Sequence, residues 1–354
     1  MARTRKRRLP EFDAARCIAV IAIVVYHTGI IFSERFYRGA GMPLDIVRLM
    51  DTFHLYALFI ISGYFTDFSR RVSAGYVRKL ARTLLVPYAA ACLLIIGGSV
   101  ICQLILGGDP GKEALEWFQA SLWGAGNGSD VALVQVRRIG GIWFLLALFW
   151  AKLAIALIAA VRDRRARAAI YLGLFIASAA SAQLAWLPWS IQSGVGAAFI
   201  MYLGRLLRDH AGFVEENRWG FAAGSAVCWL LAFLFGGDSS MAMCAYPAGP
   251  IDILGGAGAT YLILRGSRLL CRHARLAGAL VERLGRDTLV LFTVHIVESN
   301  ILPWDAWVAT FLQSVGVHPW DWATLVACRL LLDVAVTVLI MRIPVMRRVF
   351  YPRR

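Results

Sequence analysis

The stretch that decides the fold is residues 9–32, Leu-Pro-Glu-Phe-Asp-Ala-Ala-Arg-Cys-Ile-Ala-Val-Ile-Ala-Ile-Val-Val-Tyr-His-Thr-Gly-Ile-Ile-Phe. After Arg16 it carries one basic side chain, His27, within a run of apolar and small residues. Such a run is on the short side for a bilayer span, but it suffices when a few flanking residues contribute. Arg16 and His27 are eleven positions apart, which is about 16 Å along a helix axis at about 1.5 Å per residue. We therefore expect Arg16 at one face of a membrane and His27 deep within it.

A histidine inside an apolar span has two interpretations. An ionisable side chain is costly in that environment, and by default it marks a functional site. The alternative is that His27 only hydrogen-bonds a neighbouring helix, because polar residues also hold membrane helices together. The further histidines along the chain favour the functional interpretation.

The composition is that of a polytopic membrane protein. Of the 354 residues, 59% are hydrophobic and 17% are charged, and the mean hydropathy is +0.64. A soluble domain is closer to about half apolar and about a quarter charged. The net charge of +15 would suit a nucleic-acid partner, but the arginines recur in short clusters between apolar segments, which is how membrane topology is encoded. We therefore expect no nucleic-acid partner.

Hydrophobic segments predict an all-α polytopic membrane protein with about ten transmembrane helices. The segments are 15–33, 48–67, 83–106, 141–161, 167–186, 190–208, 218–236, 251–270, 286–303 and 322–342. Lys and Arg cluster on one side of them, at 3–16, 70–82, 162–167, 205–218, 265–286 and 342–354, and are sparse on the other side. Because positive loops stay inside, both termini are predicted to be cytoplasmic. We expect one membrane domain over 1–354, with basic ends at 1–14 and 343–354.

The connections on the predicted outer side include one long loop and several tryptophans. The longest, 107–140, contains a short amphipathic piece at 114–123 and is either a lid, an acceptor-binding surface or a plain insertion. Several tryptophans are typical of an interfacial aromatic belt. They are Trp304, Trp307, Trp320 and Trp322.

A second histidine, His54, lies near the outer end of the second segment, as His27 does in the first. Antiparallel neighbouring helices would bring the two imidazoles to a similar depth. They could then form a base with an orienting partner, or a metal site. The metal is the weaker interpretation, because no third ligand has a suitable spacing, and we predict none. Ser62 and Gly63 allow close helix approach.

A basic cluster follows the second segment. Arg78, Lys79 and Arg82 lie near the predicted cytoplasmic mouth, and residues three or four apart share a helix face. They could hold the phosphates of a soluble cofactor. Ordinary positive-inside charge explains the cluster equally well.

Further ionisable residues occur inside the late segments. His295 and Glu298 are three apart and face the same way on a helix. Asp252 also lies in an apolar stretch. Arg329 and Asp333 are at positions i and i+4, so we expect them to pair with each other in a structural role.

Together these residues resemble the membrane acyltransferase 3 family. The motifs are Asp13-x-x-Arg16 followed by His27, Phe53-His54 leading to Ser62-Gly63-Tyr64, the basic cluster ending in Pro87-Tyr88, Trp143-Phe144-Leu145, and Leu284-Gly285 with His295. They follow the family's order over about residues 9–300. The Phe53-His54 opening and Gly204-Arg205-Leu206-Leu207 resemble the branch of fucose 4-O-acetylases and exopolysaccharide acyltransferases.

The resemblance implies an enzyme of a bacterial-type inner membrane that moves an acyl group, usually acetyl, from cytoplasmic acyl-CoA to a sugar hydroxyl. The acceptor would be a surface or secreted polysaccharide or its lipid-linked precursor, and a polysaccharide synthase or export complex would be a partner. His27 matches the family's essential histidine, and Arg16 matches the arginine eleven before it. The family's Arg-x-x-Arg falls on Lys79-x-x-Arg82, so either Arg78 or Lys79 takes the place of its first arginine.

The chemistry fits these residues independently of the resemblance. A sugar hydroxyl is a poor nucleophile, and a neutral imidazole that takes its proton is worth about 10²–10⁴-fold in rate. An apolar span favours the neutral form of His27, and the developing oxyanion needs a donor or a cation. We assign His27 as the base. The other assignments are His54, His295 and Glu298 as orienting residues or acceptor ligands, and Arg16, Arg78, Lys79 and Arg82 as ligands of the CoA phosphates.

Two other functions stay open. A carrier or flippase for a lipid-linked sugar would also use buried histidines and a positive cytoplasmic face, but it would not turn over acyl-CoA. A non-catalytic scaffold of a polysaccharide export complex would tolerate the loss of His27.

Overall fold

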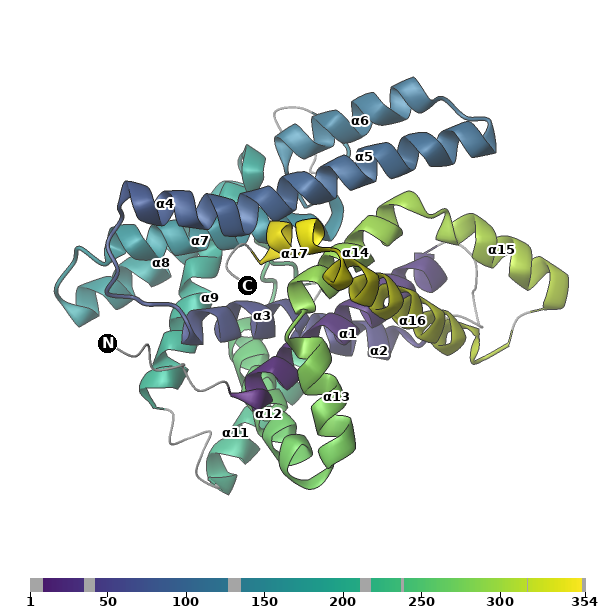
Figure 1. Ribbon diagram of the computed structural model, residues 1–354. Helices are drawn as coiled ribbons and strands as arrows, with labels where there is room; N and C mark the ends of the chain where they lie inside the picture. Colours follow the sequence, from purple (N-terminus) through teal and green to yellow (C-terminus); the bar gives the residue numbers. More distant parts are fainter. Residues whose placement is uncertain are drawn as a thin grey trace.

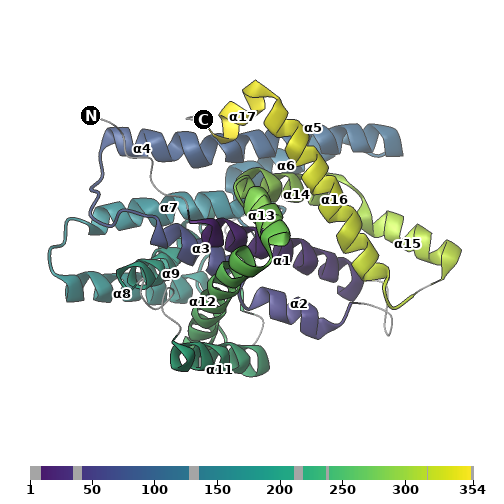
Figure 2. The same ribbon diagram turned by 60° about the horizontal axis from the view of Figure 1, so that its bottom comes forward.

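A computed structural model describes residues 9–34, 42–126, 135–210, 218–236, 239–316 and 318–351. Within these ranges the chain is built from helices, and the one β-type contact is an isolated bridge between Ser240 and Ala245 (Figures 1 and 2). The predicted all-α class is therefore confirmed. Most of the basic N-terminus, 1–8, and the last arginines of the tail, 353–354, lie outside the described residues.

The described helices follow one another along the chain. They are α1 (Pro10–Glu34), α2 (Leu44–Asp51), α3 (His54–Tyr64), α4 (Ala74–Leu80), α5 (Val86–Leu106), α6 (Pro110–Trp123), α7 (Trp143–Ile158), α8 (Arg164–Ala182), α9 (Ile191–Asp209), α11 (Trp219–Phe235), α12 (Pro250–His273), α13 (Arg275–Gly285), α14 (Thr288–Ile301), α15 (Trp304–Val315), α16 (Asp321–Arg342) and α17 (Pro344–Phe350). Three short segments complete the set: the π-helical η1 (Ala81–Leu85) and the 3₁₀ turns η2 (Gly140–Ile142) and η3 (Pro188–Ser190).

Each of the ten predicted hydrophobic segments coincides with one of these helices or with two in succession. By length and hydropathy, four helical runs of the described chain can cross a membrane. They are Pro10–Phe32, Ala74–Leu106, Gly140–Ile158 and Asp321–Arg342. The helices α11 and α14 are apolar but shorter. The number of ten spans and the cytoplasmic position of the termini thus stay predictions.

Helix α1 lies at the centre of the bundle. It packs against α2, α3, α12, α13, α14 and α16, which surround it in Figures 1 and 2. Its buried residues include Ala14, Ala15, Cys17 and Ala19, each without exposed surface. These small side chains let neighbouring helices approach closely. The stretch that decides the fold is therefore also the element around which the other helices are arranged.

The second predicted segment is broken, which the sequence did not indicate. Helix α2 ends at Asp51, and α3 begins at His54 after Phe53, whose φ of −139° is not helical. The Thr52 hydroxyl at the break accepts a hydrogen bond from Trp229 Nε1 at 2.8 Å. The break makes His54 the first residue of α3, with its imidazole directed to the same cavity as His27.

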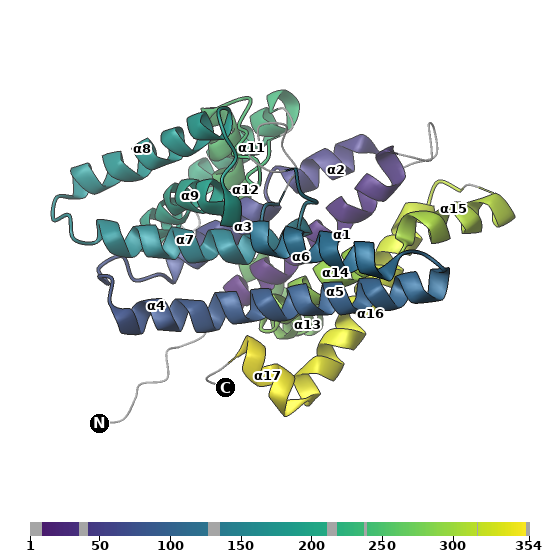
Figure 3. The same cartoon turned by 90° about the horizontal axis from the view of Figure 1, so that it is seen from above.

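Helices α4 and α5 form one continuous run through a single wide turn, η1. Pro87 follows that turn and has no backbone N–H to donate, so a local departure from α-helical pairing is expected just before it. Helix α6 returns along α5 (Figure 3) and contains the amphipathic piece predicted at 114–123. The rest of that connection at 127–134 lies outside the described residues.

The crossing of α3 and α9 depends on two glycines. A Cβ atom on Gly63 would collide with the backbone of Met201, and one on Gly204 would collide with the backbone of Ile60. Only residues without a side chain allow this approach, because a backbone cannot move aside as a flexible side chain can. The predicted close helix approach at Gly63 is therefore confirmed.

Candidate active site

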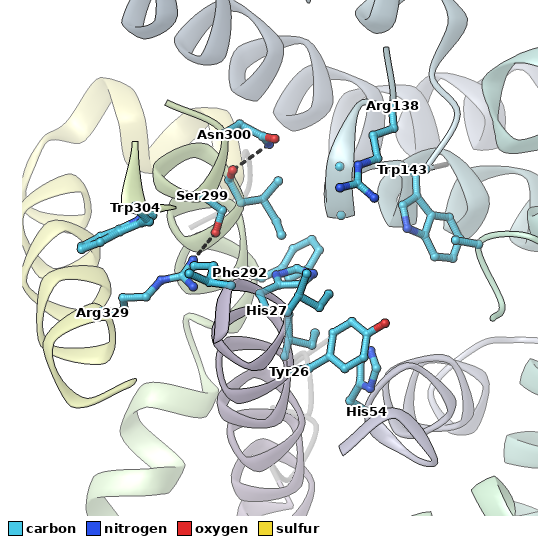
Figure 4. Close-up of a pocket in the computed structure, with 18 of the residues that line it drawn as sticks. Tyr26, His27, His54, Arg138, Trp143, Phe292, Ser299, Asn300, Trp304 and Arg329 are labelled. Carbon is cyan, nitrogen blue, oxygen red and sulfur yellow. Dashed lines mark hydrogen bonds between the residues drawn. The ribbon is translucent and has the colours of Figure 1, made fainter. Parts of the chain in front are cut away.

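A cavity of about 410 Å³ lies at the C-terminal half of α1. Its walls come from α1, the start of α3, the η2–α7 corner and the end of α14, and Figure 4 shows the side chains that face it. His27 and His54 both line it. The sequence prediction that these two imidazoles lie at a similar depth agrees with their shared cavity.

The partner of His27 is His295. The two rings stack with centroids 5.2 Å apart and an interplanar angle of 14°, and His27 Nδ1 lies 3.0 Å from His295 Nε2. His295 is fully buried and does not line the cavity, whereas His27 does. His27 is therefore the member of the pair that can meet a substrate, and His295 can act only through it.

Two carboxylates contact the ring nitrogen of His295 that does not contact His27. Its Nδ1 lies 2.9 Å from Glu298 Oε1 and 3.1 Å from Asp333 Oδ2. Carboxylates accept hydrogen bonds, so they fix the proton of neutral His295 on Nδ1 and leave Nε2 as an acceptor. His27 then donates from Nδ1 to His295 Nε2, and the lone pair of His27 lies on its Nε2. A general base needs this tautomer, because its lone pair must face the substrate. The two histidines alone would not select it; the carboxylates do, because they fix the proton of His295 on Nδ1.

The expected pairing of Arg329 with Asp333 is wrong. The Arg329 guanidinium instead donates to Glu298 Oε1 from Nε and Nη2, at 3.0 and 2.7 Å, and to the hydroxyls of Thr28 and Ser299. Both residues of α16 are buried and turned toward α14, so each finds a partner across the interface rather than along its own helix. The result is one buried network that joins α1, α14 and α16 around the His27–His295 pair.

A group of possible metal ligands does occur beside this pair, although it includes neither His27 nor His54. Ligand atoms of His295, Glu298 and Asp333 lie within 4.8 Å of one another. The third residue comes from a distant helix, so spacing in the sequence could not reveal it. These atoms already interact with one another, since His295 Nδ1 contacts both carboxylates. The Arg329 guanidinium also contacts Glu298, so a metal cation would have to compete with it for that carboxylate. The donor set therefore fits an ion-pair network better than a metal site.

His54 lines the cavity without contacting His27. Its Nδ1 lies 2.7 Å from the carbonyl oxygen of Met50, and its ring stacks on Tyr26 with centroids 5.2 Å apart. An imidazole that donates from Nδ1 to a carbonyl keeps Nε2 as an acceptor when neutral. His54 can thus accept a hydrogen bond from a hydroxyl bound in the cavity.

Three residues of the cavity were not predicted as site residues. Trp304 was assigned to an aromatic belt, but its Nε1 donates to Glu298 and its ring lies under the Arg329 guanidinium at 5.5 Å. Trp143 and Arg138 line the opposite wall in Figure 4. Trp143 occurs in a quoted motif, but nothing in the sequence distinguishes Arg138 from other arginines of the loops.

A second cavity, of about 600 Å³, lies at the N-terminal half of α1. Arg16 and Arg286 line it together with Phe65 and Tyr351. The Arg16 guanidinium donates to Asp13 Oδ1 at 3.1 Å and lies 5.0 Å from the centre of the Phe65 ring. The structure therefore places Arg16 in a cavity at the end of α1 opposite to His27, and its position at a membrane face stays a prediction.

The other predicted phosphate ligands are placed differently. None of the three lines the second cavity: Arg78 and Arg82 are exposed, and Lys79 is half-buried. Lys79 and Arg16 both lie within electrostatic range of Lys152, whose Nζ donates to Thr66 Oγ1 at 3.2 Å. Of the two neighbours that could replace the first arginine of the motif, Lys79 is the one directed inward. Lys152 is a further cation at this end that the sequence analysis missed.

Along α1 and α3, the residues that line the first cavity lie within one helical turn of those that line the second. Ile23 and Leu55 line the first and Val20 and Leu58 line the second, so along α1 and α3 the linings are three residues apart, about 4.5 Å of rise. Phe292 of α14 lines both cavities. Its ring packs edge-on against Phe144, with centroids 5.7 Å apart. A small aromatic partition thus separates the two spaces, with His27 close to it.

An imidazole that faces a cavity inside a bundle of apolar helices and is held by a second histidine and two carboxylates is the arrangement of a membrane enzyme that uses acid–base chemistry. The chain belongs to the membrane acyltransferase 3 family, whose acyltransferase domain matches residues 9–342. This confirms the family that the sequence motifs resemble, and it supports an acyltransferase activity. A comparison with curated proteins gives no match.

Proposed function

We propose that the protein transfers an acyl group, most simply acetyl, from cytoplasmic acyl-CoA to a sugar hydroxyl of a cell-surface or secreted polysaccharide or its lipid-linked precursor. The observation that carries the proposal is the position of His27. Its imidazole faces one cavity, lies close to the partition from a second, and is held by His295 and two buried carboxylates.

The proposed topology assigns the two cavities to opposite sides of a bacterial-type inner membrane. The second cavity adjoins the N-terminal end of α1, which follows the basic N-terminus and carries Arg16. Positive charge favours the cytoplasm, so this cavity would admit the donor. The first cavity would then open to the outer side, where the acceptor arrives. This arrangement agrees with ten spans and with both termini in the cytoplasm.

The chemistry of the second cavity suits the donor. Arg16 and Arg286 lie near its mouth, and Phe144, Leu145 and Phe292 lie at its inner end. Arginines bind phosphates through paired hydrogen bonds, and an apolar inner end suits a thioester arm. Lys79 and Lys152 add positive charge at the same end of the bundle.

The chemistry of the first cavity suits a carbohydrate. Aromatic rings with a few convergent polar groups are typical of small-molecule sites, and here the rings are Trp143 and Trp304. His54 and Asn300 offer polar groups to bound hydroxyls, and Arg138 offers a cation.

The reaction follows from the tautomer of His27. Nε2 takes the proton of the acceptor hydroxyl as its oxygen attacks the thioester carbonyl, and the C–O bond forms. The carbon–sulfur bond then breaks, and the thiolate takes the proton back from His27 to leave as the free thiol. His295 and its carboxylates stabilise the positive charge that His27 carries between these two steps. Arg138 is within electrostatic range of His27 and can stabilise the oxyanion.

The test uses the full chain in lipid nanodiscs with acetyl-CoA and candidate glycans or lipid-linked sugars. We expect thiol release by the wild type, and we expect it to fall at least about 100-fold in H27A, because general base catalysis contributes about 10²–10⁴-fold. H273A is the matched control, since His273 is exposed at the end of α12 and lines neither cavity.

The outcomes separate the three functions. Release that disappears in H27A and persists in H273A supports the proposal. No release by the wild type with any acceptor favours a carrier or a scaffold. Release that H27A retains would keep the acyltransferase activity and refute the role of His27.

A further inference from the structure

A third cavity, of about 460 Å³, lies between α8, α9 and the segment after α3. It shares no lining residue with the first two cavities. Arg164, Arg167 and Arg205 line it together with Phe68, Tyr171 and Tyr202. Helices α8 and α9 pack against each other and are visible at the left of Figure 1.

The charge of this cavity is not balanced by the described side chains that line it. Arg164 and Arg167 occupy the first turn of α8 and have no ion-pair partner among the described residues. Arg205 donates from Nε to both carboxylate oxygens of Asp209, at 2.7 Å each. Asp209 is the one acidic residue of the lining, so three guanidinium groups face one carboxylate. Such an excess of arginine favours an anionic ligand, and guanidinium groups match phosphate geometry in particular.

One wall of the cavity is aromatic. Tyr171 and Tyr202 stack with ring centroids 4.9 Å apart and an interplanar angle of 25°, and Phe68 packs against both rings at 6.0 and 6.1 Å. The Tyr171 hydroxyl is buried and has no hydrogen-bond partner among the described residues. A buried hydroxyl without a partner is unfavourable, and an acceptor oxygen of a bound ligand would satisfy it.

Positive-inside charge alone does not account for this arrangement. Arg162 and Arg165 belong to the same basic cluster and do not line the cavity, whereas Arg164, which is also exposed, and the half-buried Arg167 do. Positive charge that only sets the orientation in the membrane must lie on the cytoplasmic side. It does not have to line a cavity with an aromatic wall. The arginines that do line the cavity are therefore a distinct group within the cluster.

We propose that this cavity binds a phosphate group. Arg164 and Arg167 provide the charge, and the Tyr171 hydroxyl donates to a phosphate oxygen. The phosphate belongs either to the headgroup of an anionic lipid or to a soluble phosphate ester. The proposal does not depend on acyl transfer, because none of these residues lines the first cavity, proposed for the acceptor, or the second cavity, proposed for the donor. We call these two the acceptor cavity and the donor cavity.

The experiment measures binding to the full chain in phosphatidylcholine nanodiscs. In one arm, glycerol 3-phosphate, a phosphate ester that lacks the nucleotide of CoA, is the soluble probe and its affinity is measured by calorimetry. In the other arm, phosphatidylglycerol is mixed into the bilayer, and native mass spectrometry counts the lipid retained by the protein. The variants are R164Q/R167Q and Y171F, and the matched control is R162Q/R165Q, which removes the same charge from the same segment.

We expect R164Q/R167Q to weaken binding about 10-fold or more in one of the two arms, because charge-assisted hydrogen bonds are stronger than neutral ones. R162Q/R165Q should stay within about twofold of the wild type, since surface charge acts weakly at physiological salt. Y171F, which keeps the ring and the fold, should weaken binding several-fold in the same arm. The arm that responds identifies the source of the phosphate. Equal effects of the two double variants in both arms, or no binding by the wild type in either, would overturn the proposal.

Discussion

Replacement of His295 is the most informative perturbation of the site. In the wild type, His295 Nε2 accepts from His27 Nδ1 at 3.0 Å, and this contact keeps the lone pair of His27 on the atom that faces the cavity. H295A removes the acceptor, and His27 can then carry its proton on either nitrogen. We therefore expect kcat for acyl transfer to fall while the KM for acyl-CoA stays near the wild-type value, because His295 does not line the donor cavity.

The magnitude follows from one buried hydrogen bond. Such a bond holds one tautomer by about 1–3 kcal/mol, and about 1.4 kcal/mol corresponds to a factor of ten in rate. The expected loss is therefore about 5- to 150-fold in kcat. H295Q places an amide oxygen on a side chain of similar length, so it should recover part of the loss.

The assay is steady-state thiol release at several acyl-CoA concentrations, with labelled acceptor product measured in parallel. V294A is the matched control for packing, since Val294 is the buried neighbour on α14 and lines neither cavity. A kcat of H295A within twofold of the wild type, in protein that is folded and monodisperse, would refute the argument from the tautomer.

Three further predictions concern the partition, the acceptor cavity and the fold. F292A should join the two cavities and admit water, so thiol release without acceptor should rise relative to product; an unchanged ratio would contradict the role of the partition. R138Q should lower kcat, because Arg138 is assigned to the developing oxyanion, and should leave the KM for acyl-CoA near the wild-type value; an unchanged kcat would contradict this assignment. G204A should destabilise the bundle by about 1–3 kcal/mol, because its Cβ would meet the backbone of Ile60. G220A has open space around the new Cβ and should not lower the melting temperature, so equal loss in both glycine variants would refute the packing argument.

The positions of the helices could be predicted from the sequence because apolar runs are a local property. Each of the ten predicted segments contains helix, and α1 and α16 begin and end within five residues of the prediction. The break between Asp51 and His54 could not be predicted in this way. It is stabilised by a hydrogen bond from Trp229, which is distant in the sequence. Local patterns therefore locate the helices but not the contacts that interrupt them.

Helical periodicity predicted which residues of the candidate site share a face of one helix, but not which helices those faces contact. His295 and Glu298 do face the same way, because residues three apart share a face of a helix. Arg329 and Asp333 also share a face, and for that reason they were expected to pair. Periodicity does not show which helix that face meets, and α16 meets α14 and α1, where Glu298 and His295 are better placed partners. The same limit explains why Trp304 was assigned to the membrane interface.

The central claim is that donor and acceptor reach His27 from opposite sides of the membrane. The most direct measurement uses sealed, everted membrane vesicles with an acceptor glycan enclosed in the lumen and radiolabelled acetyl-CoA added outside, where the cytoplasmic face is exposed. We predict that label reaches the enclosed glycan with the wild-type protein and not with H27A. Label in the glycan of H27A vesicles, or labelling by the wild type only when both substrates are on the same side, would contradict the account.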